Sequence, residues 1–206
     1  MLEKFFIENL WLTAALWAAI YISDYYTTIY AARLYRMGAN NHVVFQGSIE
    51  LTPIYQDDVD KLRKVSRKFF LRLGLTTILI VVVWFFSTQL LKTDALFLFF
   101  TGSFFLLEAV VHIRHIRNIF LFRHARDSQD VKGTIEYSRW VILRQSGMEL
   151  FVFAAFFLLI SAITGSWFFL GGTFGCLATG RKHWVMAGKF KQQTGKVFAT
   201  DVKERS

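Results

Sequence analysis

Long apolar runs alternate with shorter polar stretches rich in lysine and arginine along the chain. A helix of about 20 apolar residues is long enough to cross the hydrocarbon core of a bilayer. The pattern therefore predicts an all-α fold, a polytopic integral membrane bundle of five transmembrane helices within a single domain, residues 1–188. The predicted spans cover residues 10–30, 69–91, 95–113, 141–164 and 166–184.

The last apolar stretch allows a second arrangement. The apolar residues between Ser166 and Gly180 are few for a full span, so four spans followed by a re-entrant segment form the alternative. The same stretch contains Gly171 and Gly175, one helical turn apart. Small residues at this spacing allow two membrane helices to pack closely.

The distribution of basic residues predicts the orientation. The chain has 24 Lys and Arg against 15 Asp and Glu, and only Lys4 and Lys92 fall on one side of a five-span bundle. The other basic residues share the opposite side, which the positive-inside rule makes cytoplasmic. The prediction is an N-terminus outside, a C-terminus inside and a basic cytoplasmic tail, residues 189–206. A re-entrant last segment would leave this tail outside, so the tail favours five spans.

A polar segment before the second apolar run predicts an amphipathic helix, residues 53–68, on the inner membrane surface. Thr52 suits an N-cap and Pro53 suits the first helical position. The basic residues of this helix and of the start of the next span would contact anionic lipid headgroups, so we expect lipid and not nucleic acid as the partner. These residues are Lys61, Arg63, Lys64, Arg67 and Lys68.

Three acidic residues interrupt the apolar runs: Asp24, Glu108 and Glu149. Measured from the predicted outer ends of their spans, each lies about 20–23 Å deep at 1.5 Å per residue. We therefore expect them to converge in one layer, in the cytoplasmic half of the bilayer. A charged side chain inside a membrane is costly, which makes this layer a functional-site hypothesis.

His112 lies one helical turn beyond Glu108 on the same face. Carboxylates with an imidazole suit a proton relay, and they also suit a single divalent ion such as zinc, iron or manganese. The candidate proton or cation ligands are Asp24, Glu108, His112 and Glu149, and the candidate metal ligands are Glu108, His112 and Glu149. Residues expected beside them are Thr28, Gln145, His115 and Glu50.

The leading hypothesis is a small membrane protein whose buried carboxylate–histidine cluster handles a proton, a cation or a small polar solute, as a homo-oligomer. The alternative is a non-catalytic accessory subunit of a larger membrane complex, in which the polar residues only join helices, at roughly 0.6 to 2 kcal/mol each. A weaker alternative is a lipid-modifying enzyme with Glu50 and the acids of residues 57–60 at the interface. The sequence identifies no catalytic residues and favours a non-enzyme.

Several cofactor classes are not expected. The single cysteine, Cys176, excludes an internal disulfide and a cysteine zinc cluster. The sequence contains no Cys-x-x-Cys-His haem motif and no phosphate-binding glycine loop, so neither haem nor a nucleotide is expected. We expect a multi-pass protein of a prokaryotic cell inner membrane, with the lipid bilayer as its partner.

Overall fold

A computed structural model describes residues 2–127 and 131–204, so residues 1 and 128–130 of the predicted domain and the last two of the predicted tail lie outside the described residues. The chain is mostly helical, as predicted, with one short pair of strands. In chain order the elements are α1 (Leu2–Glu8), α2 (Leu10–Arg36), the 3-10 helix η1 (Ala39–Asn41), β1 (Val43–Phe45), α3 (Gln56–Asp60), α4 (Arg67–Trp84), the π-helix η2 (Phe85–Leu90), α5 (Ala95–Asp127), β2 (Ile135–Tyr137), α6 (Arg139–Thr164) and α7 (Trp167–Glu204).

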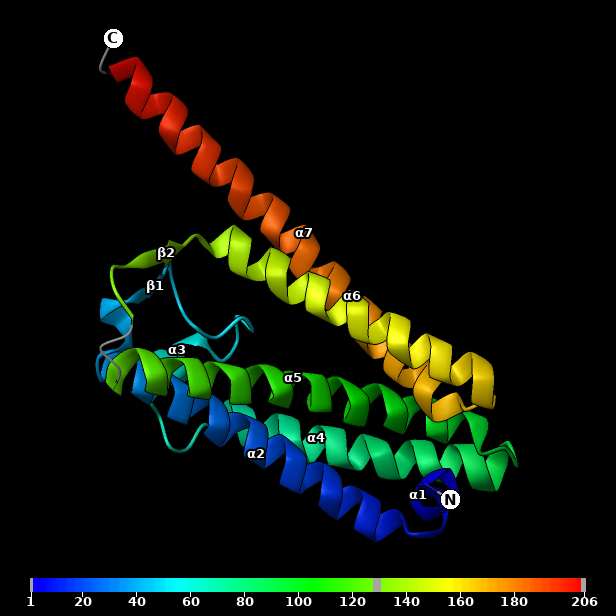
Figure 1. Ribbon diagram of the computed structural model, residues 1–206. Helices are drawn as coiled ribbons and strands as arrows, with labels where there is room; N and C mark the ends of the chain where they lie inside the picture. The colour runs from blue at the N-terminus through cyan, green and yellow to red at the C-terminus, as the bar shows by residue number, and fades with distance from the viewer. Residues whose placement is uncertain (1, 128–130, 205–206) are drawn as a thin grey trace.

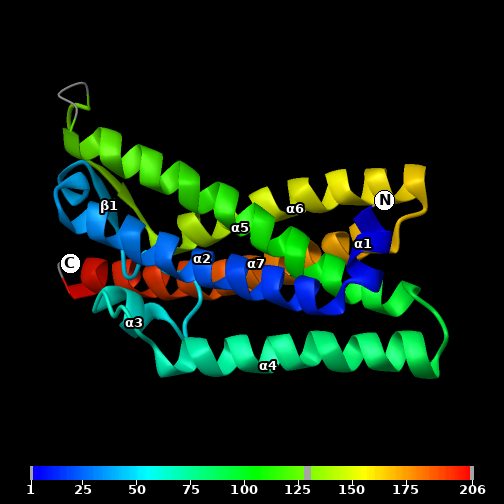
Figure 2. The ribbon, with the colours of Figure 1, turned by 90° about the horizontal axis from the view of Figure 1, so that it is seen from below.

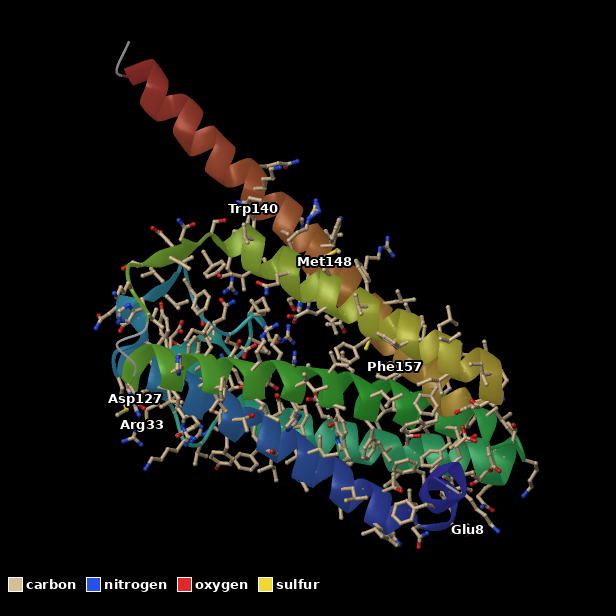
Figure 3. The ribbon with its side chains drawn as sticks, viewed as in Figure 1. Glu8, Arg33, Asp127, Trp140, Met148 and Phe157 are labelled. Carbon is tan, nitrogen blue, oxygen red and sulfur yellow. The ribbon has the colours of Figure 1, made fainter. Side chains whose placement is uncertain are left out.

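Helices α6 and α7 lie side by side, and α5 packs against α7 (Figure 1). Helices α2 and α4 contact α5 as well, and α4 lies along one edge of the bundle (Figure 2). The second half of α7 extends beyond the other helices (Figure 1). Figure 3 shows Arg33 and Asp127 at one end, here called the basic end, and Glu8 at the other, here called the N-terminal end.

Among the described residues, three helices are long and apolar enough to cross a membrane: Arg67–Leu90, which joins α4 to η2, then α5 and α6. They correspond to three of the five predicted spans. The other two predicted spans are helical, within α2 and α7, but these helices are less apolar. Asp24 and several Trp and Tyr residues lower the hydropathy of α2. The basic residues that follow Gly180 lower that of α7. The count of five spans and the orientation remain predictions.

Two helices continue past their predicted ends. Helix α5 runs to Asp127 and not only to residue 113, because residues 114–127 contain neither a proline nor a glycine that would end it. Helix α7 is continuous from Trp167 to Glu204, so the chain does not turn back within residues 166–184 and the re-entrant alternative is wrong. The backbone of residues 189–204 of the predicted tail continues this helix.

The prediction of one amphipathic helix over residues 53–68 is wrong. The structure has the short helix α3 there, and the chain then turns through Leu62, whose φ of 50° is left-handed, before α4 starts. The buried carboxylate of Asp58 accepts hydrogen bonds from Arg63 Nη1 at 2.8 Å and from Ser66 Oγ at 2.5 Å. These bonds fold the segment around Asp58 and compete with a continuous helix.

The basic residues of this segment divide into two groups. Lys61 and Arg63 pair with Asp57, at 2.5 and 3.2 Å, and the hydrogen bond from Lys61 lowers the pKa of the Asp57 carboxyl. The other three are exposed and pair with no acidic side chain in the described part of the chain. They are Lys64, Arg67 and Lys68.

A parallel pair of strands, which the sequence did not predict, closes the basic end. Strand β1 follows α2 and strand β2 precedes α6, with Val43 opposite Ile135. Arg139, just after β2, donates hydrogen bonds to the backbone carbonyls of Ser48 and Glu50. The sheet and this arginine hold the loop between β1 and α3 over the bundle.

The bundle is closely packed toward its N-terminal end, where α7 lies against α5. A Cβ atom added to Gly171 would lie 1.8 Å from the Phe99 carbonyl oxygen, and one added to Gly175 would lie 2.6 Å from the Ser103 carbonyl oxygen. Only glycine permits this approach of the two backbones. The close packing predicted from the spacing of Gly171 and Gly175 is confirmed.

Candidate functional site

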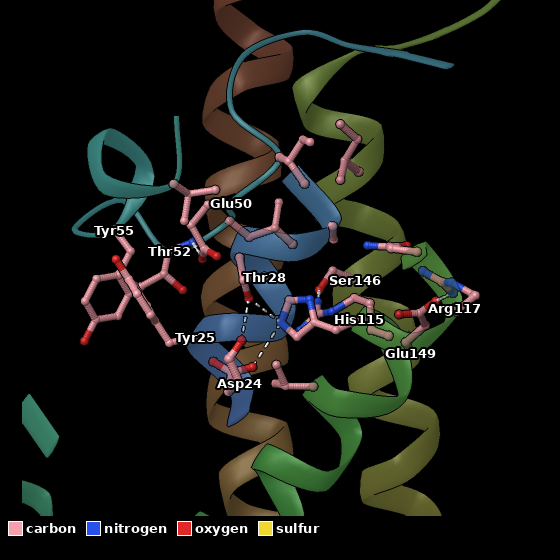
Figure 4. A pocket seen from close by; sticks show the side chains of 18 of the residues that line it. Asp24, Tyr25, Thr28, Glu50, Thr52, Tyr55, His115, Arg117, Ser146 and Glu149 are labelled. Carbon is pink, nitrogen blue, oxygen red and sulfur yellow. Dashed lines mark hydrogen bonds and ion pairs between the residues drawn. The ribbon is translucent and has the colours of Figure 1, made fainter. Parts of the chain in front are cut away.

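A cavity of about 620 Å³ lies toward the basic end, between α2, α5, α6 and α7 and beneath the loop between β1 and α3. Figure 4 shows acidic and basic side chains that reach it from several of these elements. Hydrophobic side chains such as Leu107, Val111 and Ile142 complete the wall. The acidic, basic and histidine side chains of the wall are Asp24, Glu50, Arg72, Glu108, Arg114, His115, Arg117, His124, Glu149 and His183.

Two carboxylates and a histidine meet where α2 faces α5. Ligand atoms of Asp24, Glu108 and His112 all lie within 4.8 Å of one another. Asp24 Oδ1 and Glu108 Oε2 are buried and accept no hydrogen bond from the residues that the structure describes. The Nδ1 atom of His112 donates to the Glu108 carbonyl at 2.8 Å, which in the neutral imidazole leaves a lone pair on Nε2. The structure therefore brings together three of the four ligands that the sequence suggested.

His115 lies beside this cluster on the next turn of α5. Its Nε2 atom forms a hydrogen bond with Thr28 Oγ1 at 3.1 Å and lies 3.0 Å from Asp24 Oδ1 (Figure 4). The Asp24 contact lacks hydrogen-bond geometry, so its attraction is electrostatic. The Thr28 hydroxyl donates to the Asp24 carbonyl at 2.9 Å, and its oxygen therefore accepts from His115. In its protonated form His115 is a counter-ion for Asp24.

Glu149 lies apart from the cluster, on the α6 side of the cavity. Its Oε1 atom accepts a hydrogen bond from Arg117 of α5, which pairs its charge across the gap between the two helices (Figure 4). The suggested metal set of Glu108, His112 and Glu149 is therefore not assembled, and Asp24 takes the third place. Depth along a helix does not determine which neighbour a side chain faces, and this explains the difference.

A second polar group joins α5, α6 and α7. Arg114 donates a hydrogen bond to Ser146 Oγ, and Ser146 Oγ lies 2.9 Å from His183 Nδ1. Both Ser146 and His183 are buried. Neither residue is among the candidate site residues predicted from the sequence. The sequence does contain a signal that His183 is buried. This histidine follows Cys176 and Gly180 at helical spacing and so shares their buried face of α7.

Glu50 reaches the cavity from the loop between β1 and α3 (Figure 4). Its Oε1 atom accepts a hydrogen bond from the Thr52 backbone N–H at 2.6 Å. Burial raises the pKa of the Glu50 carboxyl above its ordinary value, and this hydrogen bond only partly opposes the rise. The hydroxyls of Tyr21 and Tyr55 lie 2.9 Å apart and tie the loop to α2. Gln145, expected beside the acids, is exposed where the cavity meets the surface.

The cluster of Asp24, Glu108 and His112 combines two carboxylates with an imidazole that keeps a free lone pair. This donor set suits zinc, iron or manganese, and it also suits a proton. No family model, curated protein or solved structure matches the chain. The chemistry of the cavity is therefore the basis for assigning a function.

Proposed function

We propose that this is a five-span integral membrane protein that binds a cation, either a proton or one divalent metal ion, at Asp24, Glu108 and His112. Its N-terminus lies outside and its basic end faces the cytoplasm, in a prokaryotic inner membrane. Three long apolar helices and the concentration of basic residues between the apolar runs support this topology. Two buried carboxylate oxygens without a hydrogen-bond donor in the described chain support the site.

The pair of carboxylates carries the proposal. Two negative charges within 4.8 Å repel each other by at least about 3.5 kcal/mol even at an effective dielectric constant near 20. A proton shared by Asp24 and Glu108, or a metal ion bound between them, removes this repulsion and supplies the missing partner. The lone pair of His112 adds a nitrogen ligand, which favours a transition metal or zinc over magnesium or calcium.

His115 gives the cation a connection to the cytoplasmic side. It contacts Asp24 and lines the cavity, and His124 lines the cavity farther along α5, where it is exposed. An imidazole ring can both accept and donate a proton through its two nitrogen atoms. In the proposed role, Asp24 and Glu108 hold the cation and His115 exchanges protons with the water of the cavity.

The unpaired basic residues near the start of α4 are proposed to rest on the inner membrane surface. Lys64, Arg67 and Lys68 are exposed and lack an acidic partner in the described chain. Each such residue contributes about 1 kcal/mol of attraction to an anionic membrane surface. Lys61 and Arg63 contribute less, because Asp57 neutralises them.

The test is elemental analysis by mass spectrometry of the detergent-purified protein, with infrared spectroscopy of the same sample for protonated carboxyl groups. Glu108→Gln keeps the shape of the side chain but removes its charge, so it should abolish a stoichiometric metal or a titrating carboxyl band. Glu149→Gln is the matched control, because Glu149 also lines the cavity but pairs with Arg117.

A metal lost only in Glu108→Gln would identify a metal site. A titrating carboxyl band lost only in that variant would identify a proton site. The proposal fails if the wild-type protein shows neither bound metal nor a titrating carboxyl band. It also fails if both variants change the observed signal equally, and the polar residues then serve to join helices.

A further inference from the structure

We propose that the cavity also binds an anionic lipid of the inner leaflet. The lipid enters from the side, between α5 and α6, and its charged headgroup is held by Arg114 and Arg117. The first part of its acyl chain lies along Val111 and Leu107. This site shares the cavity with Asp24 and Glu108 of the cation cluster but holds its ligand with other residues.

Exposed wall residues on both α5 and α6 mark an opening of the cavity between these two helices. Both helices pack against α7, and α5 and α6 lie apart toward the basic end (Figure 1). On the α5 side the exposed wall residues include Arg117, Phe120 at 73% and Leu121 at 42%, and on the α6 side Gln145 is exposed. In a bilayer this opening faces lipid, because α5 and α6 are both candidate spans.

The opening lies at the depth of lipid headgroups. At 1.5 Å per residue from Ala95, Arg114 is about 28 Å and Arg117 about 33 Å along α5. The hydrocarbon core of a bilayer is about 30 Å thick, so both guanidinium groups reach its inner boundary. Val111 and Leu107 lie about 24 and 18 Å along the same helix, toward the bilayer centre. Toward the bilayer centre, the cavity wall therefore changes from charged to apolar. A lipid of the inner leaflet changes from headgroup to acyl chain in the same direction.

Arg114 has no carboxylate in direct contact among the described residues. Its hydrogen-bond partner is the neutral Ser146 hydroxyl. The carboxylates of Glu149, Glu50 and Asp24 act on its charge only from a distance. A guanidinium group taken out of water gains most from an anion that binds it directly. A phosphate group is such an anion, because arginine binds phosphate oxygens through two parallel hydrogen bonds.

Arg117 is positioned to share the same headgroup. Its present partner is Glu149 on the other side of the gap, and this pair is half exposed on the arginine side. An ion pair with that exposure contributes about 1 kcal/mol or less, so a phosphate can displace it. The volume of about 620 Å³ lies within the usual range for binding pockets and accommodates a headgroup with the start of one chain.

The test measures binding of phosphatidylglycerol to the full-length protein by native mass spectrometry, with phosphatidylcholine as the neutral comparison. The wild-type protein should retain about one phosphatidylglycerol per chain and little phosphatidylcholine. Arg114→Gln should weaken phosphatidylglycerol binding at least tenfold. Val111→Phe keeps every charge but fills the apolar part of the cavity, so it should weaken binding as well. Lys4→Gln removes an exposed charge at the N-terminal end, far from the cavity, and should leave this binding unchanged.

The variants also separate a lipid site from a small-anion site. If inorganic phosphate binds as tightly as the lipid, and Arg114→Gln weakens it while Val111→Phe does not, the ligand is a free anion and the lipid assignment is overturned. Unchanged lipid binding in folded Val111→Phe also overturns it, and this variant decides the question if Arg114→Gln does not fold. Glu108→Gln should retain the lipid, so failure of the cation site would not affect this result.

Discussion

Helices α5 and α7 meet in two different ways at the two ends of the bundle. Toward the N-terminal end their backbones touch, and a Cβ added to Gly102 would lie 1.9 Å from the Phe168 carbonyl oxygen. Toward the basic end they are linked by polar side chains, with Arg114 of α5 bound to Ser146 and Ser146 bound to His183 of α7. The same two helices therefore form a rigid contact at one end and the wall of a cavity at the other.

The difference shows that side-chain size sets the distance between these helices. Both ends of α7 are helical, but glycines occupy its contact face near Gly171 and larger polar residues occupy it near His183. Aromatic packing adds to the contact at the N-terminal end, where the ring of Phe6 stacks on Phe168 with centroids 5.0 Å apart. We infer that the N-terminal end supplies most of the stability and the basic end supplies the chemistry.

The largest effect on stability is expected from adding one methyl group where the glycines of α7 contact α5. Gly171→Ala would place a Cβ 1.8 Å from the Phe99 carbonyl, so the helices must separate, and we expect a loss of about 3 kcal/mol. Gly188→Ala is the matched control on the same helix, because no atom lies within 4 Å of the added Cβ. It should raise stability by about 0.5–1 kcal/mol through helix propensity. Unfolding in denaturing detergent measures both, and equal effects would refute the role of the contact.

A smaller effect is expected from removing a hydroxyl at the basic end. Ser146→Ala leaves Arg114 and His183 without their shared partner in a buried place, which should cost about 1–2 kcal/mol. Ser103→Ala is the comparison at the contact with α7, where Ser103 Oγ donates to the Gly171 carbonyl at 2.9 Å. Its acceptor is a helix carbonyl that keeps its own hydrogen bond, so we expect a cost of about 0.5 kcal/mol. A larger loss of stability for Ser103→Ala than for Ser146→Ala would show that polar contacts matter more at the N-terminal end than at the basic end.

The sequence predicts the features that depend on local pattern. The apolar runs locate the helices, the spacing of Gly171 and Gly175 predicts their close contact, and helix rise places Asp24 and Glu108 at a common depth. Each of these inferences needs only the period and rise of one helix at a time.

The sequence does not predict the features that depend on how helices face one another. Glu149 has the same predicted depth as Glu108 but faces Arg117, because its helix lies on the other side of the cavity. The pairing of β1 with β2 joins segments far apart in the chain, and strands of three residues carry no reliable pattern. The turn around Asp58 depends on its contacts with Arg63 and Ser66, which override the helix signal of the segment.

The smallest expected effect concerns Glu50, the acid that the loop brings to the cavity. Burial raises the pKa of its carboxyl in the folded protein above the ordinary value. Below the ordinary carboxyl pKa both the folded and the unfolded chain hold the proton, so Glu50 has no effect on stability there. As the pH rises, the unfolded chain loses the proton first, and the folded state becomes less stable until the pH exceeds the raised pKa.

Glu50→Gln removes this penalty, because glutamine stays neutral and can still accept the hydrogen bond from the Thr52 backbone N–H. The variant should therefore melt at a higher temperature than the wild-type protein at pH 7, and the two should converge at about pH 4. Glu136→Gln is the control, since Glu136 is exposed on β2 and loses the same charge. A pH-independent difference for Glu50→Gln, or the same pH dependence in Glu136→Gln, would show that general charge and not burial in the cavity governs the effect.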